Sequence, residues 1–144
     1  NCRSSSKSRS WRRKKYYKPA TTNMFKGFVL SESLKDPTVL NAFDQIRVKV
    51  EKHPEYLPKP LWHDFKLKIS DKSIRKSLEI FAKEMKKGWY AHFWNKTTLW
   101  VVLPRKIFRM PREKVWKSQE YQKCRNYAAK HGVEKQYLNF WIED

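Results

Sequence analysis

The segment Gly88–Leu103 carries bulky apolar side chains at nearly every position except around Asn95–Thr98. This pattern predicts two strands joined by a tight turn, either at Asn95-Lys96 or over Asn95–Thr98. Strand side chains alternate between the two faces of a sheet, so either even-length turn gives the same two sets. One face carries Trp89, Ala91, Phe93, Trp100 and Val102, and the other carries Tyr90, His92, Trp94, Leu99 and Val101. A half-exposed sheet has one polar face, so this hairpin needs cover on both faces.

Other parts of the chain can supply that cover. Apolar residues recur at the spacing of one helical face at Ile74, Leu78, Phe81, Ala82 and Met85. We expect this helix to pack on one face of the hairpin. A later helix, from about Ser118 to His131, and the segment Phe140-Trp141 are the simplest cover for the other face. The alternatives for that face are an open aromatic platform for a planar ligand and a dimer interface.

The order of the remaining elements predicts the fold class. Met24–Ser33 is a first strand, and Asp36-Pro37 begins a short helix whose apolar side chains are Val39, Leu40 and Phe43. Two amphipathic strands follow, one carrying Ile46, Val48 and Val50 and one carrying Phe65, Leu67 and Ile69, with a proline-rich loop between them. The order β-α-β-β-α-β is typical of the ferredoxin-like motif. We therefore expect an α+β protein, a ferredoxin-like βαββαβ sandwich with an extra hairpin strand and a C-terminal helix.

Charge divides the chain into two parts. Residues 1–23 hold eight of the 33 Lys and Arg residues and no acid, which leaves 25 basic against 14 acidic residues in 24–144, a net charge of +11. We expect residues 24–144 to form a single α+β domain and residues 1–23 to be a basic disordered tail. The tail also fits a leader, tag or upstream-derived segment, a nuclear-import or nucleic-acid arm, or an organellar transit peptide.

Cysteine content and hydropathy narrow the expected location. Only Cys2 and Cys124 are present, too few for a disulfide framework. No apolar run approaches the roughly 18 residues of a membrane span. These features predict an intracellular, cytoplasmic protein that does not enter a membrane, with a nuclear or organellar location if residues 1–23 are native.

The leading functional hypothesis is a small basic binding module that holds RNA or single-stranded nucleic acid near the hairpin. Cations interleaved with aromatic rings are what a polyanion with stackable bases favours. The candidate residues for this surface are Trp89, Trp94, Trp100, Lys86, Lys87, Arg105, Lys106 and Arg109. The strand His63–Ser70 lacks the aromatic signature of the standard RNA-recognition motif, so no residues are transferred from that family.

The alternative hypotheses are a small-molecule-binding protein or enzyme, and a homodimeric protein-interaction domain anchored at Trp94. For the enzyme, His92 and the pair His63-Asp64 are the candidates for acid–base chemistry. The four histidines and two cysteines show no metal-ligand spacing, so we expect no metal site. Only three glycines are present and none forms a phosphate-binding loop, so we expect no nucleotide cofactor.

Overall fold

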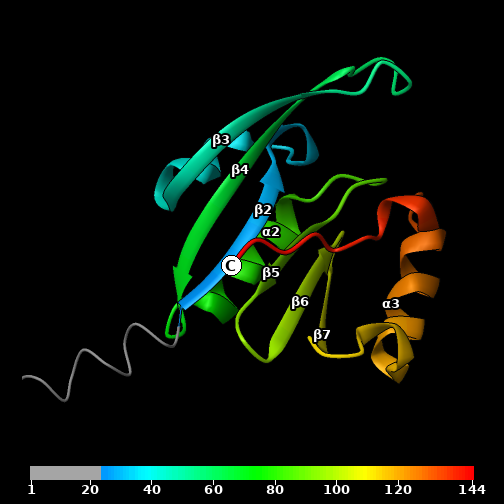
Figure 1. The fold of residues 1–144 in the computed structure, drawn as a ribbon. Coiled ribbons are helices and arrows are strands. Elements are labelled where there is room, and N and C mark those ends of the chain that lie inside the picture. Colours follow the sequence, from blue (N-terminus) through cyan, green and yellow to red (C-terminus); the bar gives the residue numbers. More distant parts are fainter. Residues whose placement is uncertain (1–23) are drawn as a thin grey trace, which may run out of the picture.

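The computed structural model describes residues 24–144, and the tail predicted for residues 1–23 lies outside them. These residues form one six-stranded antiparallel sheet with the strand order β3-β4-β2-β5-β6-β7. Helix α2 lies on one face of the sheet, and α3 with the C-terminal segment lies on the other (Figure 1). The elements are β2 (Met24–Leu30), β3 (Asp44–Lys52), β4 (Leu61–Ser70), α2 (Ile74–Glu84), β5 (Ala91–Trp94), β6 (Thr98–Leu103), β7 (Lys106–Pro111) and α3 (Gln119–Lys130).

The central strand is β2, which pairs with β4 on one side and with β5 on the other. Both neighbours run antiparallel to it, so β4 and β5 run parallel to each other and α2 connects them across the sheet. The strands β6 and β7 extend the sheet beyond β5, and β3 forms its other edge. The predicted mixed α+β class is confirmed.

The ferredoxin-like topology is not confirmed, because the six-strand order differs from that of a simple βαββαβ sandwich. The first expected helix is a 3-10 helix over Pro37–Ala42. Asp36 does act as its N-cap, since its carboxylate accepts a hydrogen bond from the backbone N–H of Thr38. Phe43 already returns to extended geometry, so the segment is too short to build a full covering helix.

The predicted hairpin is confirmed as β5 and β6. Trp94 pairs with Leu99 and Phe93 with Trp100, so the longer of the two expected turns is present. The turn is stabilised by the side chain of Asn95, whose Oδ1 accepts hydrogen bonds from the backbone N–H groups of Thr97 and Thr98. This register separates the two apolar faces as the sequence predicts.

Each face of the hairpin is covered by a different helix. On one face, Phe93, Trp100 and Val102 pack with the apolar stripe of α2. On the other, Trp94, Leu99 and Val101 pack with α3 and with Phe140, where Tyr121, Cys124 and Ala128 face the strands. Cover by the later helix and Phe140 is therefore confirmed, whereas the Trp141 side chain remains 64% exposed.

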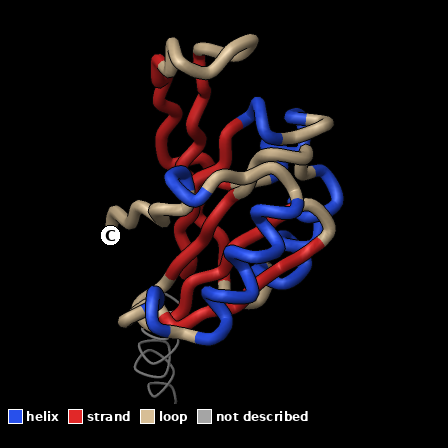
Figure 2. Tube along the Cα trace, turned by 90° about the vertical axis from the view of Figure 1, so that its right-hand side faces the viewer, coloured by secondary structure: helices blue, strands red, loops and turns tan. Residues whose placement is uncertain are grey.

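The edge strand β3 departs from the expected burial. Its apolar residues Ile46, Val48 and Val50 are 48%, 48% and 58% exposed. Within residues 24–144, the core under α2 is built from β2, β4, β5 and β6 and includes no side chain of β3. The tip of the β3–β4 hairpin also extends beyond the body of the protein (Figure 2). Alternation predicted the strand correctly, but the covering layer ends before it reaches this edge.

None of the helices formed by residues 24–144 has both the length and the apolar content needed to cross a lipid bilayer.

Gly27 leaves room for the Phe93 ring at the centre of the sheet. It pairs with Phe93 across β2 and β5, and a Cβ atom built on Gly27 would lie 2.0 Å from Phe93 Cδ2. The Phe93 ring therefore occupies the space that a side chain at position 27 would fill. The ring continues into the α2 layer, where it stacks on Phe81 with the ring centroids 5.6 Å apart.

We expect Gly27→Ala to lower the free energy of unfolding by about 1–3 kcal/mol, because the added methyl group overpacks the core. The cost should shrink in a Phe93→Leu background, where the shorter side chain leaves room for the Cβ atom. Urea denaturation of the two single variants and the double variant measures this coupling. Equal costs in the two backgrounds would contradict the close approach.

Candidate ligand-binding cleft

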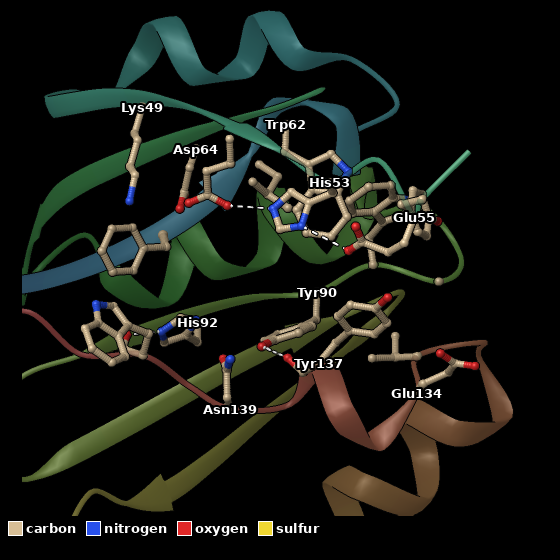
Figure 3. A pocket seen from close by; sticks show the side chains of 18 of the residues that line it. Lys49, His53, Glu55, Trp62, Asp64, Tyr90, His92, Glu134, Tyr137 and Asn139 are labelled. Carbon is tan, nitrogen blue, oxygen red and sulfur yellow. Dashed lines mark hydrogen bonds and ion pairs between the residues drawn. The ribbon is translucent and has the colours of Figure 1, made fainter. Parts of the chain in front are cut away.

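A cleft of about 700 Å³ opens on the sheet face that carries α3. One wall is the β3–β4 hairpin, and the opposite wall is the start of β5 together with the chain that follows α3 (Figure 3). Figure 3 shows Lys49, His53 and Asp64 along the first wall, facing Tyr90 and Asn139 on the second. The C-terminal segment covers the hairpin β5–β6 and contacts the β3–β4 hairpin through Glu143, and the cleft lies between this segment and the β3–β4 hairpin.

Three successive side chains on one face of β5 and its approach hold the C-terminal segment in place. The hydroxyl group of Tyr90 donates to the backbone oxygen of Tyr137. His92 Nε2 lies 2.6 Å from the backbone oxygen of Trp141, and Trp94 Nε1 donates to Asp144 Oδ1 at 3.2 Å. The period of two along the strand thus provides a row of donors under the segment.

His92 is a structural residue of this wall. It is 6% exposed, and its ring stacks near Trp94 with the centroids 5.5 Å apart. Burial lowers the pKa of His92 to about 4, despite the opposing hydrogen bond to Trp141, so the ring is neutral at pH 7. In the neutral ring, Nε2–H donates a hydrogen bond to the backbone carbonyl group of Trp141. This donor therefore stabilises the fold.

Asp64 is the most perturbed acid of the cleft. Burial raises the pKa of Asp64 to about 7, with the negative charge and hydrogen bond of neighbouring Glu51 adding to the effect, whereas Arg47 and Lys49 oppose it. Asp64 Oδ1 is buried and has no hydrogen-bond partner among the described residues. A buried oxygen without a partner carries a desolvation cost, which disfavours the charged form of the carboxyl group.

Aromatic rings close one end of the cleft. Trp62 and Trp89 meet edge to face with centroids 5.3 Å apart, and Tyr56 contacts both rings. The His53 ring stacks on Trp62 at 3.7 Å. His53 also bridges two carboxylates, with Nε2 at 3.0 Å from Glu51 and Nδ1 at 3.4 Å from Glu55. This end combines flat apolar surfaces with a chain of ionisable groups.

The three tryptophans predicted to stack bases are buried. Trp89 is 9% exposed, Trp94 1% and Trp100 6%. Trp89 lines the cleft and Trp94 lies under the C-terminal segment. Trp100 belongs to the α2 layer on the opposite face, where the guanidinium groups of Arg75 and Arg109 lie 5.4 and 5.5 Å from its ring centroid.

The predicted basic residues do not gather around one ring. Lys86 and Lys87 follow α2, Arg105 lies in the turn between β6 and β7, and Lys106 is the first residue of β7. Lys106 Nζ lies 5.7 Å from the Phe108 ring, on the face opposite Arg109. All except the half-buried Lys86 are exposed.

His63 lies outside the cleft, although its neighbour Asp64 lines it. Consecutive strand residues point to opposite faces, so His63 is directed away from the site. Its Nδ1 is 2.6 Å from Glu32 Oε2, and its backbone N–H also donates to Glu32. Burial opposes the effect, but these hydrogen bonds from His63 lower the pKa of Glu32. The two histidines considered for acid–base chemistry are thus not brought together.

Sequence reasoning missed Glu51, His53 and Trp62 as parts of one site. Trp62 and Glu51 pair across β3 and β4, so their juxtaposition depends on the register of that hairpin. The pair His63-Asp64 drew attention to the correct strand, but only the register of the sheet decides which of the two faces the cleft. Within residues 24–144, no group of three or more His, Cys, Asp or Glu residues could hold a metal ion.

Comparison with known proteins adds no assignment: no protein-family model, curated protein or solved structure matches the chain.

We expect Asp64→Asn to stabilise the protein more at pH 8 than at pH 5. The pKa of Asp64 is about 7 in the folded state against an ordinary value of 3.8. As the pH rises from 4 to 7, the unfolded chain releases this proton first, so the folded state loses stability. Asparagine is neutral throughout, and each kcal/mol of difference corresponds to about 2–8 °C in Tm. Thermal melting of both proteins at the two pH values tests this.

The matched control is Asp71→Asn, which removes the same charge from an exposed turn between β4 and α2. Its effect on Tm should differ little between pH 5 and pH 8. An Asp64→Asn effect that is equal at the two pH values would contradict the buried carboxyl group.

Proposed function

We propose that the protein binds a small organic molecule in the cleft between the β3–β4 hairpin and the C-terminal segment. The observation that carries this proposal is a cleft of about 700 Å³ whose lining combines aromatic rings with the partly buried carboxyl group of Asp64. Ligand sites are concave, largely apolar and provided with a few polar groups that fix orientation. The aromatic end at Trp62 and Trp89 and the carboxyl group of Asp64 supply these two components.

The position of the cleft also favours a ligand site over a gap in packing. Its floor is the rigid sheet, and its aromatic end is held by ring-to-ring contacts of Tyr56, Trp62 and Trp89. Its opposite wall is fixed by the hydrogen bonds that Tyr90 and His92 make to the C-terminal segment. A site built on fixed elements holds its geometry without a bound molecule.

A blocking variant tests the proposal. Asn139 is exposed and lines the cleft, so Asn139→Trp should fill part of it without disturbing the core. A library of small aromatic and polar fragments is screened by NMR on the full chain. We expect hits that shift the indole N–H signals of Trp62, Trp89 and Trp141, with affinity falling at least tenfold in Asn139→Trp.

The control is Asn126→Trp, the same substitution at an exposed position of α3 outside the cleft. It should leave fragment binding unchanged. Fragments that bind both tryptophan variants equally, or that shift no cleft indole signal, would refute the proposed site.

Nucleic-acid binding is the second candidate, and the observation that favours it is the net charge of +11 on residues 24–144. The burial of Trp89, Trp94 and Trp100 shifts this candidate from base stacking toward contacts with phosphate groups. Such contacts are largely independent of sequence and weaken steeply as salt increases.

We expect any binding of single-stranded RNA to the folded part to decrease when Arg105, Lys106 and Arg109 are all changed to Gln. Fluorescence anisotropy at about 50 and 200 mM salt measures the affinity and its salt dependence. The comparison variant changes the three basic residues at positions 12–14 to Gln. If only this tail variant weakens binding, the folded part does not contribute.

We also infer that β2, β3, β4, α2 and β5 are a variant of the ferredoxin-like arrangement. The order β3-β4-β2-β5 and the crossover of α2 from β4 to β5 around β2 support this. In this variant the first helix is reduced to the 3-10 helix Pro37–Ala42. A fold of this type hosts many activities, so the fold alone does not identify the function.

A further inference from the structure

The charged side chains that line the cleft are mostly acidic, whereas the protein as a whole is basic. The whole chain has 33 Lys and Arg residues against 14 Asp and Glu. The cleft lining holds five of those 14 acids, against two cations, Arg47 and Lys49. The acids that line it are Glu51, Glu55, Asp64, Glu134 and Glu143. A concave site lined by one sign of charge attracts the opposite sign.

Most of these acids already have partners within the protein. Glu51 and Glu55 flank His53, and Glu143 pairs with Arg47 at 3.0 Å and with Lys66 at 3.3 Å. The side chain of Glu134 accepts a hydrogen bond from Gln136.

Asp64 differs from the other acids, because its Oδ1 is buried with no partner among residues 24–144. Asp64 also lines the cleft, so a cation bound there would stabilise the ionised form of its carboxyl group.

The surrounding rings favour a donor that carries positive charge. The lining includes Tyr90, whose ring face attracts cations through the negative charge of the π system, whereas one face of Trp62 is already covered by His53. The protein uses this contact itself at the neighbouring ring of Phe28, where Lys66 Nζ lies 5.8 Å from the centroid. A carboxyl group among aromatic rings is a common way to bind an ammonium group with an apolar body.

The two cations of the lining lie on β3. Arg47 is neutralised by Glu143, and Lys49 is exposed. Neither satisfies Asp64 Oδ1. They therefore reduce the negative charge of the cleft without occupying the acceptor.

We propose that the ligand of this cleft is an organic cation, a protonated amine on an aromatic or apolar body, with Asp64 as its counter-ion. This inference rests on the ligand-binding function proposed above. Asp64 is the specificity-determining residue of the site, because its carboxylate forms an ion pair with a cationic ligand and none with a neutral one.

Three probes that share an indole ring test the charge requirement on the full chain: indole, tryptamine and indole-3-acetate, which are neutral, cationic and anionic at pH 7.5. Isothermal titration calorimetry gives their affinities, and the indole N–H signals of Trp62 and Trp89 report the site. We expect tryptamine to bind at least tenfold more tightly than indole, and indole-3-acetate to bind most weakly.

Asp64→Asn should remove the preference for tryptamine over indole, so that the two probes bind with similar affinity. The matched control Asp71→Asn should keep the preference, because it removes an equal charge outside the cleft. Retention of the preference in Asp64→Asn would overturn the role of this carboxyl group.

The result separates the two proposals. If indole or indole-3-acetate shifts the cleft signals and binds as tightly as tryptamine, the cationic ligand class is wrong and the ligand-binding site stands. If none of the three probes binds and the fragment screen also finds no cleft ligand, both proposals fail.

Discussion

The β5–β6 hairpin places large apolar side chains on both of its faces. Both faces must be shielded from water, and this requirement determines where the two covering layers of the protein lie. The crossover from β4 to β5 brings α2 to one face, where Phe93 and Trp100 pack. The chain must then pass to the other face, where α3 and Phe140 cover Trp94 and Val101. Burial of a large aromatic or aliphatic side chain contributes about 1.5–3 kcal/mol, so neither face could remain open without a partner.

The cleft is a consequence of where this second cover ends. The C-terminal segment follows β5 because Tyr90, His92 and Trp94 hold it through hydrogen bonds. It reaches the β3–β4 hairpin through the ion pairs of Glu143 with Arg47 and Lys66, but leaves a cleft where Asp64 lies beside Glu51. A low-dielectric cleft strengthens the interactions of such a group and makes an unpaired oxygen costly. The same layer that completes the core thus leaves a polar site at its border.

Local patterns predicted the elements whose partners are close in sequence. The even-length turn of the hairpin, the α2 stripe and the start of α3 near Ser118 all depend on neighbouring residues, and all are present. Burial on β3 was predicted less well, because Val48 and Val50 alternate correctly but lie beyond the edge of the α2 layer. Alternation shows that one face is apolar, and the extent of the covering layer decides whether that face is buried.

The amino-acid sequence by itself determined that this chain needs a sheet covered on both sides and that its folded part is basic, because periodicity and charge are properties of the residues alone. The tertiary structure decided which neighbour in His63-Asp64 faces a site. Strand alternation separates the two side chains, and the pairing of β4 with β3 and β2 sends Asp64 into the cleft and His63 toward Glu32. It also decided that Tyr90, His92 and Trp94 hold the C-terminal segment, since these contacts join residues about 50 positions apart, a distance that no local pattern spans.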